Sequence, residues 1–382
     1  MNPDRQVRSP DRQVSFKSCR CGQGTVGSVK DTPFLYLDPK IIIEKYNQFR
    51  KIFPDYDLFY SIKANSDAPV LDTLAELGCG FDIASRNELK LLVERKINPE
   101  KILFSAPIKL PSHIAAAYDY GIDTYAVDSL AEVDKLAKLA PSSHVYVRLA
   151  VDNSGALWPL TRKFGVNLED AAHLLAYAKD QKLKPIGATF HVGSQNISKE
   201  NWGLAIQTVA RLAGYLEKRS IEISFLNIGG GFPARYLENI PSLDEFGRYI
   251  KDEIAKAFQT KMQFVLEPGR AMVAESGVLV ATVIGKALRG ARMWYYLDIG
   301  LFNGLMEAYE KFRYPVITQK KGIEKIATLA GPSCDSVDVI YEEVLLPDLA
   351  VGDKVMFLSS GAYTTSYKTY NGFDFPAVVV RE

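Results

Sequence analysis

The sequence predicts an α/β protein made of a TIM-like (β/α)8 barrel followed by a separate β domain. From Thr32 onward, short β-rich runs alternate with helical stretches, and eight such βα units fit into about 220 residues. After Glu275 the long helices stop and strand-like runs remain. An open, doubly wound parallel sheet is the structural alternative that the same alternation allows.

These patterns divide the 382 residues into four expected parts. They are a disordered basic tail at 1–30, an N-terminal strand at 31–40 that joins the β domain, the barrel at 41–275, and the C-terminal β domain at 276–382.

The barrel strands are expected where β-branched and aromatic residues cluster in short runs. Those runs are Leu58–Ala64, Gly80–Ala84, Ile102–Ala106, Thr124–Val127, His144–Ala150, Ile186–His191, Ser224–Ile228 and Phe264–Glu267. Apolar residues at three-to-four spacing predict helices between them. The clearest are Asp67–Leu77, Arg86–Lys96, Ala171–Leu183 and Trp202–Lys218.

The expected β domain, which could resemble a sandwich or a small barrel, contains strand-like runs without long helices between them. These are Val278–Ile284, Met293–Leu297, Lys325–Leu329, Lys354–Leu358 and Ala377–Val380. Phe34–Asp38 is also strand-like and is expected to join this domain, which would tie the two ends of the chain together.

The first 30 residues differ from the rest. The run Pro3–Val7 recurs as Pro10–Val14, and the segment carries six Lys or Arg against two Asp or Glu. It has almost no large apolar residues, so it cannot bury enough surface to fold alone. A basic targeting arm, or a metal site at Cys19-Arg20-Cys21, is the functional alternative.

Composition excludes several classes of protein. The formal net charge is +1, which gives no global reason to bind nucleic acid or an anionic membrane. The four cysteines form neither a disulfide framework nor a zinc pattern, so no metal is expected. No apolar run is long enough to span a membrane, and no signal-peptide core is visible. We therefore expect a cytoplasmic protein.

Reactive groups follow several of the expected barrel strands, where the functional groups of such barrels lie. Lys63 ends the first strand, and a desolvated lysine is a good Schiff-base nucleophile, although it could also simply extend to solvent. His191 ends the sixth strand, where it could equally be a structural residue.

The last two barrel strands are followed by candidate anion-binding groups. Gly229-Gly230-Gly231 lets the backbone approach a phosphate closely, and Arg270 could bind it with a bidentate fork. Glu267 could hold a proton on a ring nitrogen, although Glu267 and Arg270 could also form an ordinary surface ion pair. A carbonyl for Lys63, a ring nitrogen and a phosphate together match pyridoxal 5′-phosphate.

From about Thr32 to its C-terminus the chain resembles the alanine-racemase-like (fold type III) pyridoxal-phosphate enzymes, and within them the ornithine/lysine/arginine decarboxylase group. The matching motifs are Tyr60–Asn65, Phe81–Ser85, Lys163–Gly165, His191–Gln195, Gly229–Pro233, Glu267–Arg270, Gly331–Asp335 and Gly361–Thr364. The resemblance implies decarboxylation of a basic L-amino acid.

It also implies residue roles. Lys63 would bind the cofactor aldehyde, His191 would stack on its ring, and Glu267 would pair with the ring nitrogen. Cys334 would donate a proton to the α-carbon and, with Asp335, would come from the neighbouring subunit of a homodimer that shares its active sites. Further cofactor contacts would come from Asp82, Arg148, Ser194, Gly230, Gly231, Gly269, Arg270 and Tyr363, with Glu88 as another pocket residue.

The substrate is less sharply defined. Asp335 offers a carboxylate to a distal cationic group, and Tyr309 or Glu310 lies in the segment that resembles the family's specificity helix. Tyr370 is a further candidate substrate contact. L-Ornithine, giving putrescine for polyamine synthesis, is the first expectation, with L-lysine, L-arginine or a specialised diamino acid as alternatives. An amino-acid racemase and a non-catalytic regulatory relative are the other classes.

Overall fold

The computed structural model describes residues 31–159, 163–259, 262–310, 312–373 and 376. The expected tail at 1–30 and the expected strand Ala377–Val380 lie outside the described residues. The chain forms two compact units. Among the described residues, the barrel unit contains those within Pro39–Pro233, Pro241–Val273 and 368–373, and the β unit contains those within 31–38, Ala234–Ile240 and Ala274–Tyr367.

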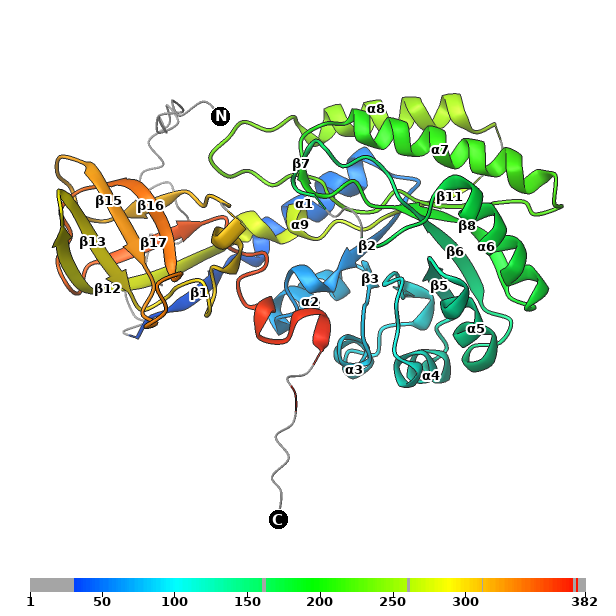
Figure 1. Cartoon of the computed structure of the whole chain (residues 1–382), viewed down its shortest axis with the longest axis horizontal. Coiled ribbons are helices and arrows are strands. Elements are labelled where there is room, and N and C mark those ends of the chain that lie inside the picture. Colours follow the sequence, from blue (N-terminus) through cyan, green and yellow to red (C-terminus); the bar gives the residue numbers. More distant parts are fainter. Residues whose placement is uncertain (1–30, 160–162, 260–261, 311, 374–375, 377–382) are drawn as a thin grey trace, which may run out of the picture. The chain divides into compact units, whose positions relative to one another are not determined.

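The barrel unit contains eight parallel strands, as the sequence predicts (Figure 1). They are β2 (Asp57–Ser61), β3 (Gly80–Asp82), β4 (Ile102–Leu103), β5 (Thr124–Val127), β6 (His144–Leu149), β8 (Lys184–Phe190), β10 (Phe225–Asn227) and β11 (Gln263–Leu266). Their order is β4-β3-β2-β11-β10-β8-β6-β5. A parallel bridge between Phe104 and Tyr125 joins the two ends of this order, so the sheet is a nearly closed barrel and not an open sheet.

Helices surround these strands (Figure 1). They are α1 (Pro39–Ile52), α2 (Ala68–Glu76), α3 (Arg86–Glu94), α4 (Pro111–Tyr120), α5 (Leu130–Leu139), α6 (Leu168–Asp180), α7 (Glu200–Glu217), α8 (Leu243–Ala257) and the short α9 (Arg270–Val273). Side-chain caps define several starts: Ser85, Ser129 and Asn167 each accept a hydrogen bond from a backbone N–H three residues on. The Asn167 cap explains why α6 begins before the expected Ala171.

A small two-stranded sheet was not expected from the sequence. Strands β7 (Ala156–Trp158) and β9 (Ser194–Asn196), which α6 and β8 separate in the chain, pair antiparallel outside the main sheet. Gly193, which precedes β9, has a φ of +88°, and a Cβ there would lie 2.4 Å from the Ala156 Cβ. Glycine therefore permits both the turn before β9 and the close packing of β9 against β7.

The β unit is a seven-stranded sheet with a core of aliphatic and aromatic side chains. Its strands are β1 (Phe34–Leu37), β12 (Gly277–Arg289), β13 (Arg292–Leu297), β14 (Val316–Thr318), β15 (Lys325–Ala330), β16 (Val339–Leu346) and β17 (Lys354–Leu358). Strand β1 pairs antiparallel with β12, so the N-terminal strand belongs to this sheet. Strands β14 and β16 were not among the expected elements.

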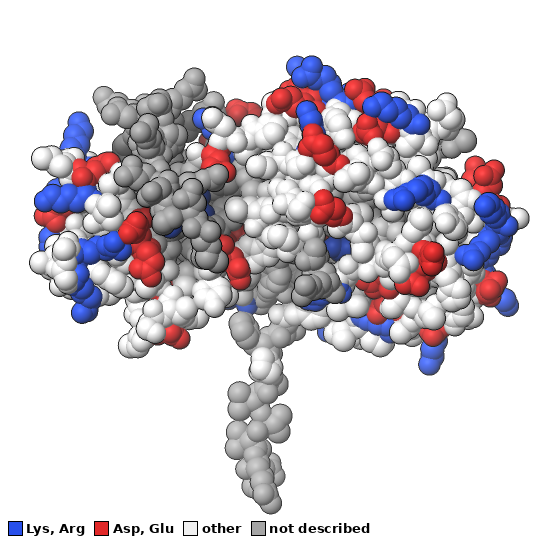
Figure 2. Space-filling view, turned by 45° about the horizontal axis from the view of Figure 1, so that its top comes forward, with Lys and Arg blue, Asp and Glu red and all other residues white. Residues whose placement is uncertain are grey.

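Surface charge is mixed on the face shown in Figure 2, where basic and acidic side chains are interspersed. That distribution agrees with the near balance of 46 Lys and Arg against 45 Asp and Glu. Within the described part of the chain, no helix is long and apolar enough to cross a membrane.

A buried lysine joins the two ends of the barrel sheet. Lys109 donates hydrogen bonds to the carbonyls of Ala106 (2.8 Å), beyond β4, and Ala126 (2.6 Å), in β5. Its ammonium also lies 3.6 Å from a Glu132 carboxylate oxygen, and burial lowers the pKa of Lys109 to about 8. Lys109 thus links the residues after β4 to β5, beside the Phe104–Tyr125 bridge and the contact of those two rings (centroids 6.1 Å apart).

We expect Lys109→Ala to lower the free energy of unfolding by about 1–3 kcal/mol, because the change leaves buried carbonyl groups without their donor and removes one of the two ammonium groups beside Glu132, the other being that of Lys135. Urea unfolding followed by circular dichroism measures this. Lys138→Ala, at an exposed position of α5, is the matched control with an expected change near zero. If Lys109→Ala lowers the free energy of unfolding by less than about 1 kcal/mol, the contact between β4 and β5 does not depend on this side chain.

Candidate active site

The expected reactive residues of the barrel unit follow strands of one parallel sheet, so their positions converge at one end of the barrel. Lys63 lies in a 3-10 turn (η2, Ile62–Ala64) directly after β2, two residues beyond the strand end. Its ammonium lies 3.5 Å from a carboxylate oxygen of Asp82, the last residue of β3. The Lys63 side chain remains 32% exposed, so it is accessible from the barrel mouth.

Asp82 is held by two strands besides its own. The Ser61 hydroxyl at the end of β2 donates to Asp82 Oδ2 (2.8 Å), and the Ser105 N–H beyond β4 donates to Oδ1 (3.3 Å). These bonds fix the carboxylate beside Lys63. Asp82 thus orients the lysine and balances its charge.

Glu267, directly after β11, is a buried carboxylate with a fixed orientation. Its Oε1 accepts hydrogen bonds from the Ser105 hydroxyl and from the Asn227 side-chain amide (2.6 Å). Ser105 in turn shares a 2.7 Å hydrogen bond with the Tyr146 hydroxyl. Asn227 also accepts the Gly229 N–H at 2.9 Å, which connects Glu267 to the start of the triple-glycine turn.

Burial disfavours the charged form of two carboxyl groups at this end of the barrel. Burial, followed by the nearby charge of Asp82, raises the pKa of Glu267 to about 7. Burial likewise raises the pKa of Glu88 to about 7, although Glu88 Oε2 accepts the Ala84 N–H at 2.6 Å. A cation placed beside these carboxylates would therefore be strongly favoured.

His191, directly after β8, is held as a neutral imidazole. Burial and the charges of Arg148 and Lys63 lower the pKa of His191 well below its usual value. Its Nδ1 accepts the Gly193 N–H at 3.0 Å, so the ring proton of the neutral form is on Nε2. A neutral ring of fixed orientation suits stacking against a flat ligand.

The triple-glycine turn brings backbone close to His191 and Glu267. A Cβ on Gly230 would lie 2.5 Å from the Glu267 carbonyl oxygen, and one on Gly231 (φ +92°) would lie 2.4 Å from the Gly193 carbonyl oxygen. Only glycine fits at these two positions. Close by in the same unit, the buried Arg270 donates to the Ser194 hydroxyl (Nε to Oγ, 3.2 Å).

Two other expected cofactor contacts lie in the same unit. Arg148, near the end of β6, has its guanidinium 5.3 Å from the Phe164 ring centroid. Gly269 packs near Ser61, since a Cβ on Gly269 would lie 3.3 Å from the Ser61 Cβ. Tyr370, also in the barrel unit, is 40% exposed.

The remaining expected site residues belong to the β unit. Cys334 and Asp335 lie on the exposed turn between β15 and β16. Tyr309 and Glu310 end the 3-10 helix η5 (Met306–Glu310) and are both exposed. Tyr363 follows β17 and has a φ of +59°.

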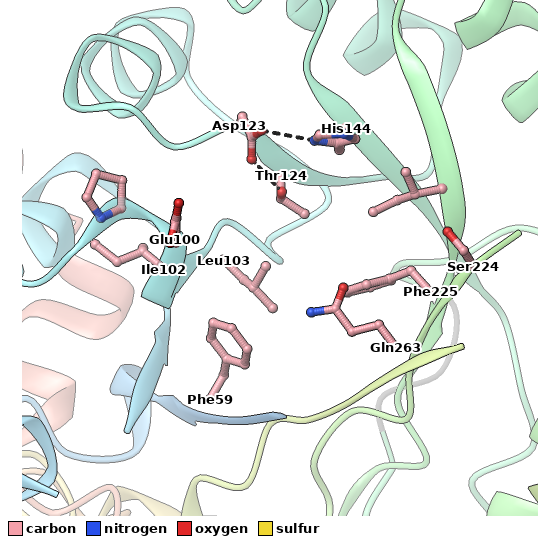
Figure 3. A pocket seen from close by; sticks show the side chains of 12 residues that line it. Phe59, Glu100, Ile102, Leu103, Asp123, Thr124, His144, Ser224, Phe225 and Gln263 are labelled. Carbon is pink, nitrogen blue, oxygen red and sulfur yellow. Dashed lines mark hydrogen bonds and ion pairs between the residues drawn. The ribbon is translucent and has the colours of Figure 1, made fainter. Parts of the chain in front are cut away.

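A cavity of about 350 Å³ lies elsewhere in the barrel unit (Figure 3). Its lining includes the first residues of several strands, among them Thr124, His144 and Phe225. Asp123 and His144 form an ion pair at its edge (3.0 Å). Because the strands are parallel, this cavity lies at the opposite end from Lys63 and Glu267, so it is not the site of their chemistry.

Sequence reasoning missed the residues that orient the charged groups. Ser105 and Asn227 both contact Glu267, and Ser61 contacts Asp82. Asn227 carried a usable signal, because a polar residue directly before the triple glycine interrupts an apolar strand. Ser105 had no comparable signal, since a serine after a strand is common.

Comparison with known proteins identifies the family. Residues 40–274 match the family model for the pyridoxal-binding domain of pyridoxal-dependent decarboxylases. The chain belongs to this family. It is a pyridoxal-phosphate-dependent decarboxylase of the ornithine/lysine/arginine type, as the sequence motifs predict.

The relatives agree along most of the chain. The lysine/ornithine decarboxylase of Selenomonas ruminantium is 36% identical, over 92% of this chain and 90% of the relative. A crystal structure of SrLDC in complex with PLP and cadaverine superposes with a TM-score of 0.85 at 34% identity, covering 93% of this chain and 92% of that one. The arginine decarboxylase of Paramecium bursaria Chlorella virus, bound to agmatine, gives 0.85 at 31% identity, covering 91% and 96%.

The residues of the barrel mouth fit pyridoxal phosphate. Lys63 would supply an amine for the aldehyde, and the glycine turn with Arg270 would supply donors for a phosphate. Burial and the nearby Asp82 raise the pKa of Glu267, and a protonated ring nitrogen is the kind of cation that such a pair of carboxyl groups would favour.

We expect Glu267→Gln to flatten the pH dependence of stability in the cofactor-free decarboxylase. The raised pKa means that the folded state binds more protons than the unfolded state between about pH 4.5 and 7. The stability of the wild-type protein should therefore fall as pH rises through this window, and the stability of the glutamine variant should fall less. Melting temperatures at pH 5 and 7.5 measure the effect.

Glu200→Gln is the control at a carboxyl group of the opposite kind, because the Ser198 hydrogen bond lowers the pKa of Glu200. The stabilising contribution of ionised Glu200 is lost only as pH falls below about 4.5, so this variant should follow the wild-type slope between pH 5 and 7.5. Equal slopes for Glu267→Gln and wild type would contradict a raised pKa at Glu267.

Proposed function

We propose that this enzyme decarboxylates L-ornithine to putrescine and CO2 and so supplies polyamine synthesis, with L-lysine and L-arginine as the competing substrates. The observation that carries the proposal is the convergence of Lys63, Asp82, His191 and Glu267 at one end of the barrel. Asp335, directly after Cys334, favours a substrate with a cationic side chain over one with a distal carboxylate.

The barrel unit would hold the cofactor through groups already oriented by hydrogen bonds. Lys63 would bind its aldehyde, with Asp82 beside the ammonium. Glu267 would keep the ring nitrogen protonated, and the neutral His191 would stack on the ring. The bound cofactor supplies an electron sink for the charge left at the α-carbon when CO2 departs.

The phosphate would lie against the glycine turn. Gly230 and Gly231 would offer backbone N–H groups, and Arg270 a charged fork. The lining would be completed by Ser194, Gly269 and Tyr363. Arg148 is a positive group near His191 and adds to the charge that keeps the imidazole neutral.

The β unit would supply the substrate-facing groups, from the second subunit of a homodimer. Cys334 would deliver the proton to the α-carbon, and Asp335 would bind the distal ammonium or guanidinium. The length of the substrate side chain that the site accepts would be set by Tyr309, Glu310 and Tyr370. The exposure of the loop that carries Cys334 and Asp335 supports this arrangement, since both side chains are free to face another chain.

A substrate panel tests the proposal. With pyridoxal phosphate present, we expect CO2 and amine release from L-ornithine to exceed release from L-lysine, L-arginine or meso-diaminopimelate by about tenfold or more in kcat/KM. Lys63→Ala should lower turnover by roughly a thousandfold or more, because the cofactor loses its covalent anchor. Lys90→Ala, at an exposed position of α3, is the matched control and should leave turnover unchanged.

The panel also separates the alternatives. If agmatine or cadaverine forms faster than putrescine, the preferred substrate is L-arginine or L-lysine and not L-ornithine. Glu310 or Tyr309 would then be the residue that selects the substrate. Cofactor binding without CO2 from any of the four substrates would contradict the proposal and favour a racemase, which a chiral assay detects, or a regulatory protein.

Subunit mixing tests the shared site. Lys63→Ala and Cys334→Ala are each expected to be inactive, but random re-association should restore about a quarter of wild-type activity, because half of the dimers then contain one intact site of two. Sedimentation measured alongside establishes that exchange has occurred. No recovery after verified exchange would place Lys63 and Cys334 of one site on the same chain.

A further inference from the structure

A buried carboxylate in the β unit links the two segments that carry the proposed substrate-recognition residues. Asp338, just before β16, is 3% exposed. Its Oδ1 accepts the Leu301 N–H at 2.7 Å, and its Oδ2 accepts the Ser333 N–H at 3.1 Å. One side chain thus binds backbone of two segments that are about 30 residues apart in sequence.

The first segment is the loop 331–338. Asp338 fixes it at both ends, since the Gly331 N–H donates to the Asp338 carbonyl (2.8 Å) and the Asp338 N–H donates to the Asp335 carbonyl (3.1 Å). Between the buried Gly331 and the buried Asp338, residues 332–337 are all exposed. Cys334 and Asp335 therefore lie on an exposed loop, and Asp338 holds the ends of that loop together.

The second segment leads to η5. From Leu301, which is buried in the core of the β unit, the chain turns so that the Leu305 N–H donates to the Gly300 carbonyl at 3.0 Å. Leu305 is also fully buried, and η5 begins at the next residue. The exposed Tyr309 and Glu310 are thus anchored through the same stretch of backbone that Asp338 binds.

Two glycines allow the carboxylate to approach both segments. A Cβ on Gly300 would lie 2.2 Å from an Asp338 carboxylate oxygen, and a Cβ on Gly331 would lie 2.3 Å away. Neither glycine has a positive φ, so their requirement is steric. The absence of a side chain at Gly300 and at Gly331 thus leaves the space that the Asp338 carboxylate fills.

We propose that Asp338 is a positioning residue for substrate selection: it sets the loop of Cys334 and Asp335 and the segment of Tyr309 and Glu310 in a fixed relation. This inference rests on the proposed function for the roles of those four residues. A displacement of one segment is transmitted to the other through the shared carboxylate. Discrimination between amino acids of different length then depends on Asp338, although it need not touch the substrate.

The test uses Asp338→Asn in the full chain with cofactor. An asparagine of the same shape has one acceptor oxygen, so it cannot accept both backbone N–H groups as the carboxylate does. The matched control is Asp353→Asn, in the same unit, whose carboxylate accepts the Ala350 N–H of its own turn (2.8 Å) and lies 3.8 Å from the exposed Lys320 ammonium.

The first readout is hydrogen exchange in peptides covering 298–306 and 331–337. We expect Asp338→Asn to speed exchange in both peptides together, by about threefold or more, while the control changes neither. This readout does not require activity, so it remains informative if the proposed reaction is wrong. Exchange that changes in only one peptide, or in neither, would overturn the link between the segments.

The second readout is the ratio of kcat/KM for ornithine over lysine, which should shift by about fivefold or more, mainly through KM, with the cofactor absorbance unchanged. A folded variant with the wild-type ratio would overturn the role in selection. If Asp338→Asn does not fold, Asp338→Glu replaces it under the same criteria, since it keeps the charge but places the carboxylate one methylene further out.

Discussion

The parallel alignment of eight strands in a nearly closed ring is the constraint on which the site depends. Parallel strands end at the same edge, so residues more than 200 positions apart in sequence, such as Lys63 and Glu267, come together after the paired strands β2 and β11. The alignment requires the ring to close, and the closing contact between β4 and β5 is short. The buried Lys109 ammonium adds hydrogen bonds to the two backbone hydrogen bonds that Phe104 makes with Thr124 and Ala126.

The closed ring of strands also buries carboxyl groups and thereby raises their pKa values. Glu267 and Glu88 are buried, and both have pKa values near 7, which is unfavourable for a carboxylate that must be charged. Hydrogen bonds from the surrounding serine, asparagine and backbone groups offset only part of the free-energy cost of ionising these buried carboxyl groups. A site of this kind is completed energetically by a cationic ligand, so cofactor binding and the stability of the barrel mouth are linked.

Much of this could be predicted from sequence, for reasons that differ between elements. The barrel strands were predictable because buried parallel strands are continuous apolar runs, and Lys63 and Glu267 interrupt or end such runs. The two-stranded sheet of β7 and β9 was not predictable, because its three-residue strands are distant in sequence and too short to show a periodic pattern. Ser105, Asn227 and Asp338 were missed because their roles arise from contacts with distant segments, which a pattern along the chain does not show.

The hydrogen bond from the Gly193 N–H to His191 has a consequence for enzyme kinetics. Because its ring is buried beside Arg148 and Lys63 and its Nδ1 accepts a hydrogen bond, His191 does not become charged in the range where histidines usually titrate. A kinetic transition near neutral pH would ordinarily be assigned to such a histidine. In this enzyme we expect such a transition to report another group, and Glu88, whose pKa burial raises to about 7, is the first candidate, while the imidazole stays in one protonation state.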